Sequence, residues 1–255
     1  MSSSQRTPAM TKVSMLVLPF VIFTASCSST ADDPGTSPKS SPALTVQVSK
    51  VEAKPAATAK EALRSFLYAL SDPDEAAAQA VIKADSSNDV RELVAVVCLF
   101  SGESVRFKKA LTKQFGDDSW EKFNSEESGG ATVTVQSRET CDELLQGDLV
   151  ESENEATLSG PDLSAPLKAM RVDGGWLIDA EASLLSGGIP AAAMRAQMMS
   201  IIKPIRKFTL QVENAPAKWE TTLEKLDETM GQEMLQALMG AGAEINFSDV
   251  EIKSE

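Results

Sequence analysis

The sequence predicts an α+β fold, in which N-terminal helices pack on an antiparallel sheet and a helical extension follows. From residue 60 to 115, apolar side chains recur at intervals of three and four residues, which is typical of helices with one buried face. From residue 131 to 179, apolar and polar residues alternate, as they do in half-buried strands. Because the apolar face of such a sheet must be covered, we expect the helices to lie on it.

The first predicted helix, residues 60–70, has a single apolar stripe. The stripe consists of Ala62, Leu63, Phe66, Leu67 and Leu70. The helix is expected to end at Ser71. Asp72 is then expected to cap a second helix, with Pro73 in its first position.

Two more helices are predicted at residues 90–99 and 104–115, separated by Ser101-Gly102. Three strands are predicted after them, at residues 131–136, 155–159 and 166–179. Asp173-Gly174-Gly175 divides the last stretch into a hairpin, because such turns need positive φ angles that glycine adopts without steric cost. In its second strand, Trp176 and Ile178 are expected to face one side.

Three stretches resemble the cone-shaped nuclear transport factor 2-like superfamily, especially its small exported bacterial lipoproteins. They read KEALRSFLYALSDPDEAA, ATVTV and PLKAMRVDGGWLID, within residues 59–185. The resemblance implies a curved sheet wrapped around a helix, often enclosing an apolar pocket, and frequent dimerisation through the sheet. The chain departs from the family by an extra helical stretch before the sheet and a long segment after it.

Some members of this superfamily are isomerases or dehydratases that use an Asp or His base with Tyr or Asp donors. Here the only tyrosine is Tyr68, which is expected to point outward from its helix, and Asp179 is the best carboxylate candidate. A solvated structural role is favoured for both, so no catalytic residue is assigned. An isomerase or dehydratase activity remains the alternative to a non-enzymatic role.

The composition argues against several other functions. The chain has 255 residues, with 24 Lys and Arg, 37 Asp and Glu and no His, for a net charge of −13. So acidic a protein is not expected to bind nucleic acid. Without histidine there can be no Ser-His-Asp triad and no His-bound zinc, and we expect neither a metal nor a cofactor.

The N-terminus resembles the signal peptide of bacterial lipoproteins. A basic start and the apolar run at residues 15–23 lead into Thr24-Ala25-Ser26-Cys27, which is similar to a lipobox, although Thr24 stands where an aliphatic residue is usual. The prediction is cleavage after residue 26, lipidation of Cys27, and anchorage to the membrane. By the same resemblance, Ser28 indicates the periplasmic face of the outer membrane. The alternative is cleavage after Ala31 and a secreted or periplasmic soluble protein.

Residues 27–58 are predicted to be a disordered tether. They are rich in Ser, Thr, Pro and Ala, a composition that buries too little apolar surface to become ordered. A coil of this length spans about 30 Å. An edge strand at Leu44, Val46 and Val48 is the alternative for the end of this segment.

Two cysteines remain in the exported chain once Cys27 is lipidated. Cys98 lies in an apolar helical stretch and Cys141 in a polar stretch between strands. In an oxidising compartment they could form a disulfide, and two buried free thiols are the equal alternative.

Residues 186–255 are predicted to form a helical pair with a basic face. Between Glu181 and Glu213 there are four cations and no acid. These cations are Arg195, Lys203, Arg206 and Lys207. The face could contact an anionic membrane or an acidic partner, although Pro204 interrupts it. The alternative is a helix packed on the cone domain, with its cations balanced by nearby acids.

These patterns lead to a non-enzymatic, lipid-anchored envelope protein. Its cone-like domain, residues 59–185, is expected to bind a small apolar ligand or an envelope protein. A homodimer through the sheet is the further partner that the resemblance implies. Besides the enzyme, a membrane or assembly module acting through the C-terminal helices is the other alternative.

Overall fold

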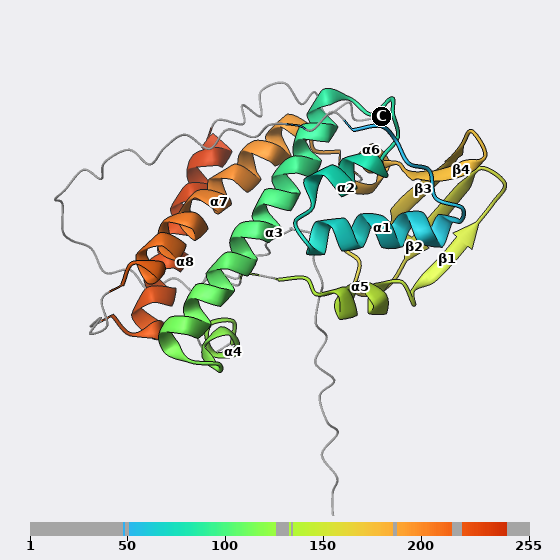
Figure 1. The fold of residues 1–255 in the computed structure, drawn as a ribbon. Helices are drawn as coiled ribbons and strands as arrows, with labels where there is room; N and C mark the ends of the chain where they lie inside the picture. The colour runs from blue at the N-terminus through green and yellow to red at the C-terminus, as the bar shows by residue number, and fades with distance from the viewer. Residues whose placement is uncertain are drawn as a thin grey trace, which may run out of the picture.

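The computed structural model describes Val48 and residues 51–125, 133, 135–185, 188–215 and 221–243. The predicted signal peptide, Cys27 and most of the predicted tether therefore lie outside the described residues. Within them the fold is α+β, as the sequence predicts, with a four-stranded antiparallel sheet and helices on either side of a long central helix (Figure 1).

The sheet is a meander at one end of the molecule (Figure 1). Its strands pair in chain order, β1 (Asp148–Glu151), β2 (Glu155–Ser159), β3 (Leu167–Val172) and β4 (Gly175–Ile178). Asp173 and Gly174 join β3 to β4 with φ angles of 49° and 81°, as a two-residue hairpin loop requires. The predicted strand at 155–159 and the predicted hairpin are both confirmed.

Helix α1 (Ala59–Ser71) packs against β3 and β4. Its N-terminus is fixed by a capping box, in which the Thr58 hydroxyl accepts from the Glu61 N–H and the Glu61 carboxylate accepts from the Thr58 N–H. The facing side chains of helix and sheet are all buried. They are Leu63, Phe66, Leu67 and Leu70 of α1 with Ala156, Leu158, Leu167, Ala169, Trp176 and Ile178 of the sheet.

The outer edge of β4 is covered by two segments of the chain. Ala56 pairs with Trp176 through two backbone hydrogen bonds of 2.9 and 2.8 Å, and the Lys54 N–H donates to the Ala80 carbonyl at 2.7 Å. Ile82 forms a parallel bridge with Ile178. The folded body therefore includes Lys54 and Ala56, whereas the sequence placed the end of the tether at residue 58.

Helix α2 (Glu75–Ala80) is capped by Asp74, whose side chain accepts from the Ala77 N–H at 2.9 Å. The prediction of Asp72 as this cap is wrong. Asp72 is the C-terminal cap of α1, and its carboxylate accepts hydrogen bonds from Arg138.

Helix α3 is one continuous helix of 28 residues, Asn88–Phe115. Both predicted helical stretches, 90–99 and 104–115, are therefore helical, and only the predicted break at Ser101-Gly102 is wrong. Gly102 faces the Pro73 side chain in the turn between α1 and α2, and a Cβ at position 102 would be in ordinary van der Waals contact with it at 3.4 Å. Glycine within a helix costs about 1 kcal/mol relative to alanine, and the packing of α3 against α7 stabilises the continuous helix.

Three short helices and one strand were not predicted. They are α4 (Ser119–Phe123), α5 (Arg138–Leu144), α6 (Ala180–Leu184) and β1. Conversely, residues 135 and 136 of the predicted strand 131–136 have no regular structure. Val133 is buried, and its N–H donates to the Asn124 side chain at 2.8 Å. The remainder of that stretch is outside the described residues.

Helices α3, α7 (Ala191–Glu213) and α8 (Leu223–Ala243) lie side by side on the other side of the molecule (Figure 1). Ion pairs join Arg195 to Asp89 near the helix starts and Arg106 to Glu213 nearer their ends, so α3 and α7 run parallel. The predicted helical pair is confirmed, and α7 continues through Pro204. α7 packs directly on α3, and α8 packs on α7.

Candidate functional site

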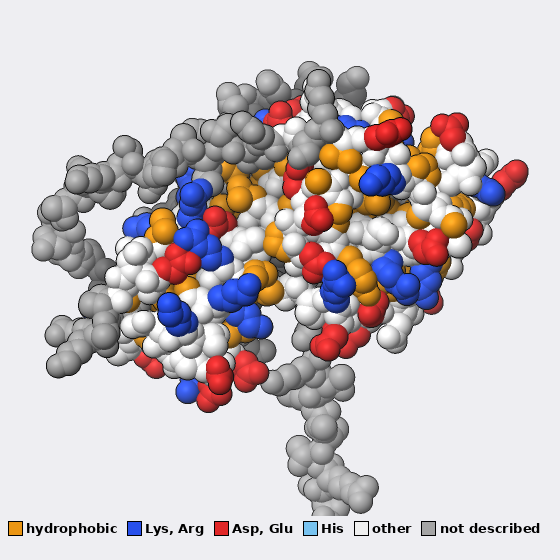
Figure 2. Space-filling model, in the orientation of Figure 1, with side chains coloured by type: hydrophobic (Ala, Val, Ile, Leu, Met, Phe, Trp, Pro, Cys, Tyr) orange, Lys and Arg blue, Asp and Glu red, His pale blue; other side chains and the backbone are white. Residues whose placement is uncertain are grey.

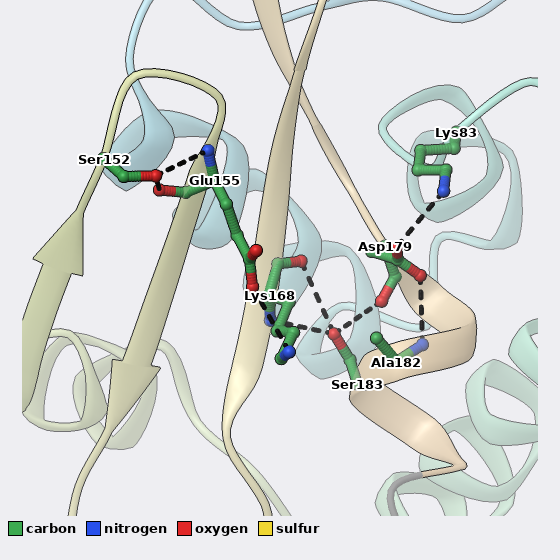
Figure 3. Close-up of polar contacts among 7 residues, drawn as sticks. All are labelled: Lys83, Ser152, Glu155, Lys168, Asp179, Ala182 and Ser183. Atoms are coloured by element: carbon green, nitrogen blue, oxygen red, sulfur yellow. Dashed lines mark hydrogen bonds and ion pairs between the residues drawn. The ribbon is translucent and has the colours of Figure 1, made fainter.

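The carboxylate of Asp179, the strongest catalytic candidate from sequence, has a structural role (Figure 3). It caps α6 by accepting from the Ala182 N–H at 3.0 Å, and it accepts from the Lys83 ammonium at 3.1 Å. Burial lowers the pKa of Lys83, but the hydrogen bond and charge of Asp179 outweigh that effect and raise it overall. An acid held by a cap and a cation is poorly placed to remove a proton from a substrate.

The same network ties α6 to the sheet (Figure 3). The Ser183 hydroxyl accepts from the Lys168 N–H at 2.9 Å and donates to the Asp179 carbonyl at 2.7 Å. The Lys168 ammonium reaches the Glu155 carboxylate on β2 at 3.2 Å. These polar side chains therefore have a structural role, because each of them binds one element of the fold to another.

Tyr68 is partly buried, and its hydroxyl lies in an exposed environment at the surface, as the sequence analysis expects. Its hydroxyl donates to the Asp142 carboxylate of α5 at 2.7 Å, and Arg138 lies 5.0 Å over its ring. The hydrogen bond to Asp142 raises the pKa of the Tyr68 phenol. Tyr68 therefore holds α5 against α1.

Cys98 and Cys141 are both buried free thiols, so the disulfide alternative is not formed and the free-thiol alternative holds. The Cys141 thiol donates to the Leu67 carbonyl at 3.6 Å. Burial, reinforced by Glu75 and Asp74, raises the pKa of Cys98 to about 12, and burial raises that of Cys141 to about 11. Both thiols are neutral at physiological pH and poorly nucleophilic.

Three of the four cations singled out on α7 contact acids of this chain. Arg195 pairs with Asp89 at 3.8 Å and also with Glu92, Arg206 lies 3.8 Å from Glu103, and Lys207 lies 2.5 Å from Glu233 on α8. Lys203 is exposed. Acidic and basic side chains are accordingly interspersed over this side of the surface (Figure 2). This arrangement matches the alternative in which the basic face is balanced by nearby acids.

The interface between α3 and α7 also contains a buried acid. Glu103 is 8% exposed and lies between Arg106 and Arg206, at 3.9 and 3.8 Å. Near the end of α3, Arg106 forms a bidentate pair with Glu213, which lowers the pKa of that carboxyl and raises that of the guanidinium. These groups bind each other across a helix interface.

Three large apolar side chains among the described residues are exposed. Val150 on β1 is 70% exposed, Met239 on α8 64% and Leu210 on α7 40%. The sequence analysis assigned no role to any of them. For β1 the available signal was the short apolar pair Leu149-Val150 between Gly147 and Ser152, residues typical of turns.

Within the described ranges, no group of three or more Asp, Glu or Cys side chains is arranged to hold a metal ion. Nor does any described helix combine the length and apolar character needed to cross a bilayer. Comparisons with protein-family models, with curated proteins and with solved structures found no match to this chain. The function must therefore be argued from the chain itself.

Proposed function

We propose that this chain is a lipid-anchored protein of the bacterial envelope that binds a protein partner and does not act as an enzyme. The lipobox-like Thr24-Ala25-Ser26-Cys27 supports lipidation of Cys27 and anchorage at the periplasmic face of the outer membrane. Because Lys54 already bonds to the folded body, the tether in this proposal is shortened to residues 27–53, for which a coil dimension of about 29 Å is expected.

The choice of a protein partner over a small apolar ligand rests on one observation. The side chains that face each other between α1 and the sheet fill that interface with their own apolar atoms, and those of α1 are at most 1% exposed. Phe66 and Trp176, the bulkiest of them, both belong to this core. Recognition is therefore assigned to the outer surface.

The relation to the nuclear transport factor 2-like superfamily is part of this proposal. It is supported by the position of α1, which lies across β3 and β4, and by the hairpin at Asp173 and Gly174. The superfamily's enzymatic members are a weaker guide here, because Asp179 and Tyr68 both bind other elements of the fold.

Anchorage can be tested by expressing the full-length chain in a bacterium and separating the membranes. We expect wild type in the membrane fraction with the mass of a diacylated Cys27, and the Cys27→Ala variant in the soluble fraction. A Thr30→Ser variant, which lies outside the lipobox-like motif and keeps the cysteine, serves as the control. An unmodified wild-type chain in the soluble fraction would contradict the lipid anchor.

Partner binding can be tested by chemical crosslinking in the same cells, followed by purification and mass spectrometry. One recurrent envelope protein crosslinked to wild type is the expected result. Native mass spectrometry of the purified chain distinguishes the alternative: a reproducible extra small-molecule mass would show that a ligand fills the interior and would overturn the choice of a protein partner.

A further inference from the structure

Strand β1 is the sheet edge that no described segment covers. The strand order places β1 and β4 at the two edges, and β4 is covered by Ala56 and by the residues around Ile82. Among the described strands, β1 pairs with β2 alone, and it lies at the outer side of the sheet (Figure 1). An uncovered edge presents backbone donors and acceptors that another strand can pair with.

The backbone groups that point outward from β1 follow from its register. The hairpin closes where the Ser152 N–H donates to the Glu155 carbonyl at 2.7 Å. Hydrogen-bonded pairs alternate along an antiparallel ladder, so Val150 faces Thr157 in the next bonded pair. The N–H and C=O groups of Leu149 and Glu151 therefore point away from β2, and these four groups are available to an added strand.

The side chains of β1 give this edge a distinct chemical pattern. Asp148 and Glu151 are exposed at its ends, Val150 is 70% exposed, and Leu149 is partly buried against the core. Neither acid has an ion pair with any described residue, whereas Glu155 on β2 is paired with Lys168. The edge therefore reads acid, apolar, apolar, acid.

We propose that the β1 edge binds an extended segment of a partner protein with the pattern base, apolar, apolar, base, which adds to the sheet as a fifth strand. Either strand direction places the two bases of this segment opposite Asp148 and Glu151, where cross-strand opposite charges stabilise the pair. The two apolar residues lie opposite Leu149 and Val150. This inference rests on the proposed function and specifies the partner's chemistry.

A second copy of the chain is a poor occupant of the same edge. Antiparallel pairing of two β1 strands would place Asp148 opposite Glu151 twice, and parallel pairing would place each acid opposite itself. Like charges directly opposite one another destabilise a strand pair. The same two acids that attract a basic strand thus disfavour self-association.

The test uses the full-length chain, purified in non-ionic detergent, and two fluorescent peptides, Gly-Lys-Val-Val-Lys-Gly and Gly-Glu-Val-Val-Glu-Gly. Fluorescence anisotropy should show that the basic peptide binds at least about tenfold more tightly, since two cross-strand pairs change from attraction to repulsion. Equal binding of the two peptides, or binding of neither, would overturn the proposal.

Two variants locate the binding site. The double substitution Asp148→Lys and Glu151→Lys should invert the preference, so that the acidic peptide binds more tightly. Asp117→Lys with Glu228→Lys is the matched control, because both residues are exposed, have no ion pair among the described residues and lie away from the sheet. Inversion in the control, or its absence in the β1 variant, would contradict binding at this edge.

A Glu151→Pro variant removes one outward N–H while leaving the bonded pair of Val150 and Thr157 in place. We expect it to reduce binding of the basic peptide at least about tenfold with an unchanged circular dichroism spectrum. If it misfolds, the inversion experiment still decides. A wild-type dimer in analytical ultracentrifugation that Glu151→Pro converts to monomer would identify a second copy as the occupant and overturn the proposal.

Different results would contradict the proposed function and the assignment of the binding site to the β1 edge. If the envelope partner crosslinked in cells is retained by the Asp148→Lys, Glu151→Lys variant, the partner binds elsewhere and only the β1 assignment is wrong. If wild type captures no partner and carries no lipid, the proposed function itself is wrong, whatever the peptides show.

Discussion

The two sides of the molecule are held together differently. Between α1 and the sheet, the contacts are between apolar side chains such as Phe66 and Trp176. Between α3 and α7, an apolar stripe is flanked by the pairs Arg195–Asp89, Arg206–Glu103 and Arg106–Glu213. The first interface is stabilised by the burial of apolar surface away from water. The second also buries charged groups, which stabilise the fold only when each has a partner of opposite charge.

The difference matters for what each side can tolerate. An apolar interface accepts another side chain of similar volume with little loss, since dispersion and hydrophobic burial are not directional. A partly buried ion pair does not, because removing one partner leaves the other charge without compensation. Substitutions on the two sides should therefore show different patterns of loss and recovery.

The largest loss is expected from Phe66→Ala on the apolar side. Phe66 is fully buried between α1 and the sheet, and truncating such a residue costs about 3 to 5 kcal/mol in the free energy of unfolding. Urea unfolding followed by circular dichroism measures it. Leu210→Ala on the partly exposed face of α7 is the control, with an expected loss below about 0.5 kcal/mol. A loss under about 1 kcal/mol for Phe66→Ala would show that this interface is not the core described.

The second effect tests the charged interface. Arg206→Met leaves the buried Glu103 carboxylate without its neighbour on α7, so we expect a loss of about 1 to 3 kcal/mol. Replacing both residues by methionine should recover most of this loss, because two apolar side chains can pack where the pair was. The same urea titrations give the coupling energy as a double-mutant cycle. Additive losses would mean that Glu103 and Arg206 do not interact.

A smaller loss of stability is expected at Asp179, which follows β4 and both caps α6 and pairs with Lys83. Asp179→Ala removes the cap of α6 and the partner of Lys83, at a cost of about 1 to 2 kcal/mol. Asp179→Asn keeps a capping oxygen and should lose less. Thermal unfolding of the two variants makes the comparison. An equal loss in both would assign the whole effect to the ion pair and none to the cap.

The smallest effect is the acid sensitivity of the pair between Arg106 and Glu213. The hydrogen bond from Arg106 lowers the folded pKa of Glu213, so its stabilisation is present above the unfolded pKa and is lost as pH falls through the folded value. Because this carboxylate is partly exposed, the expected contribution is only about 0.5 kcal/mol. Urea titrations at pH 7 and pH 3 should show a smaller pH dependence for Glu213→Gln than for wild type. The same pH dependence in both proteins would show that the pair of Arg106 and Glu213 does not contribute to the free energy of unfolding.

Sequence patterns predicted the elements whose signal is local. The apolar stripe of α1, the alternation of β2 and the glycine turn between β3 and β4 can each be recognised within a short window. The continuity of α3 was missed because Ser101-Gly102 is a local helix-breaking signal, whereas the packing of α3 against α7 joins segments far apart in the sequence. Strand β1 was missed because four residues are too few to show a period.

The polar contacts were beyond sequence reasoning for a related reason. Lys83 and Asp179 are 96 residues apart, and Tyr68 and Asp142 are 74 apart. Nothing in either local pattern indicates a partner at that distance. The amphipathic face of α7 was visible, but the acids that neutralise it lie on α3 and α8, and only their packing identifies them.

The parallel arrangement of α3 and α7 has a consequence for how the chain folds. Two helices joined by a short loop run antiparallel and can assemble early from local contacts, as α7 and α8 can. α3 and α7 are separated by the whole sheet, so their contact requires a long loop to close first, and proteins rich in such distant contacts fold slowly. We therefore expect the two sides to fold as one cooperative unit. The docking of α7 onto α3 is expected to limit the folding rate.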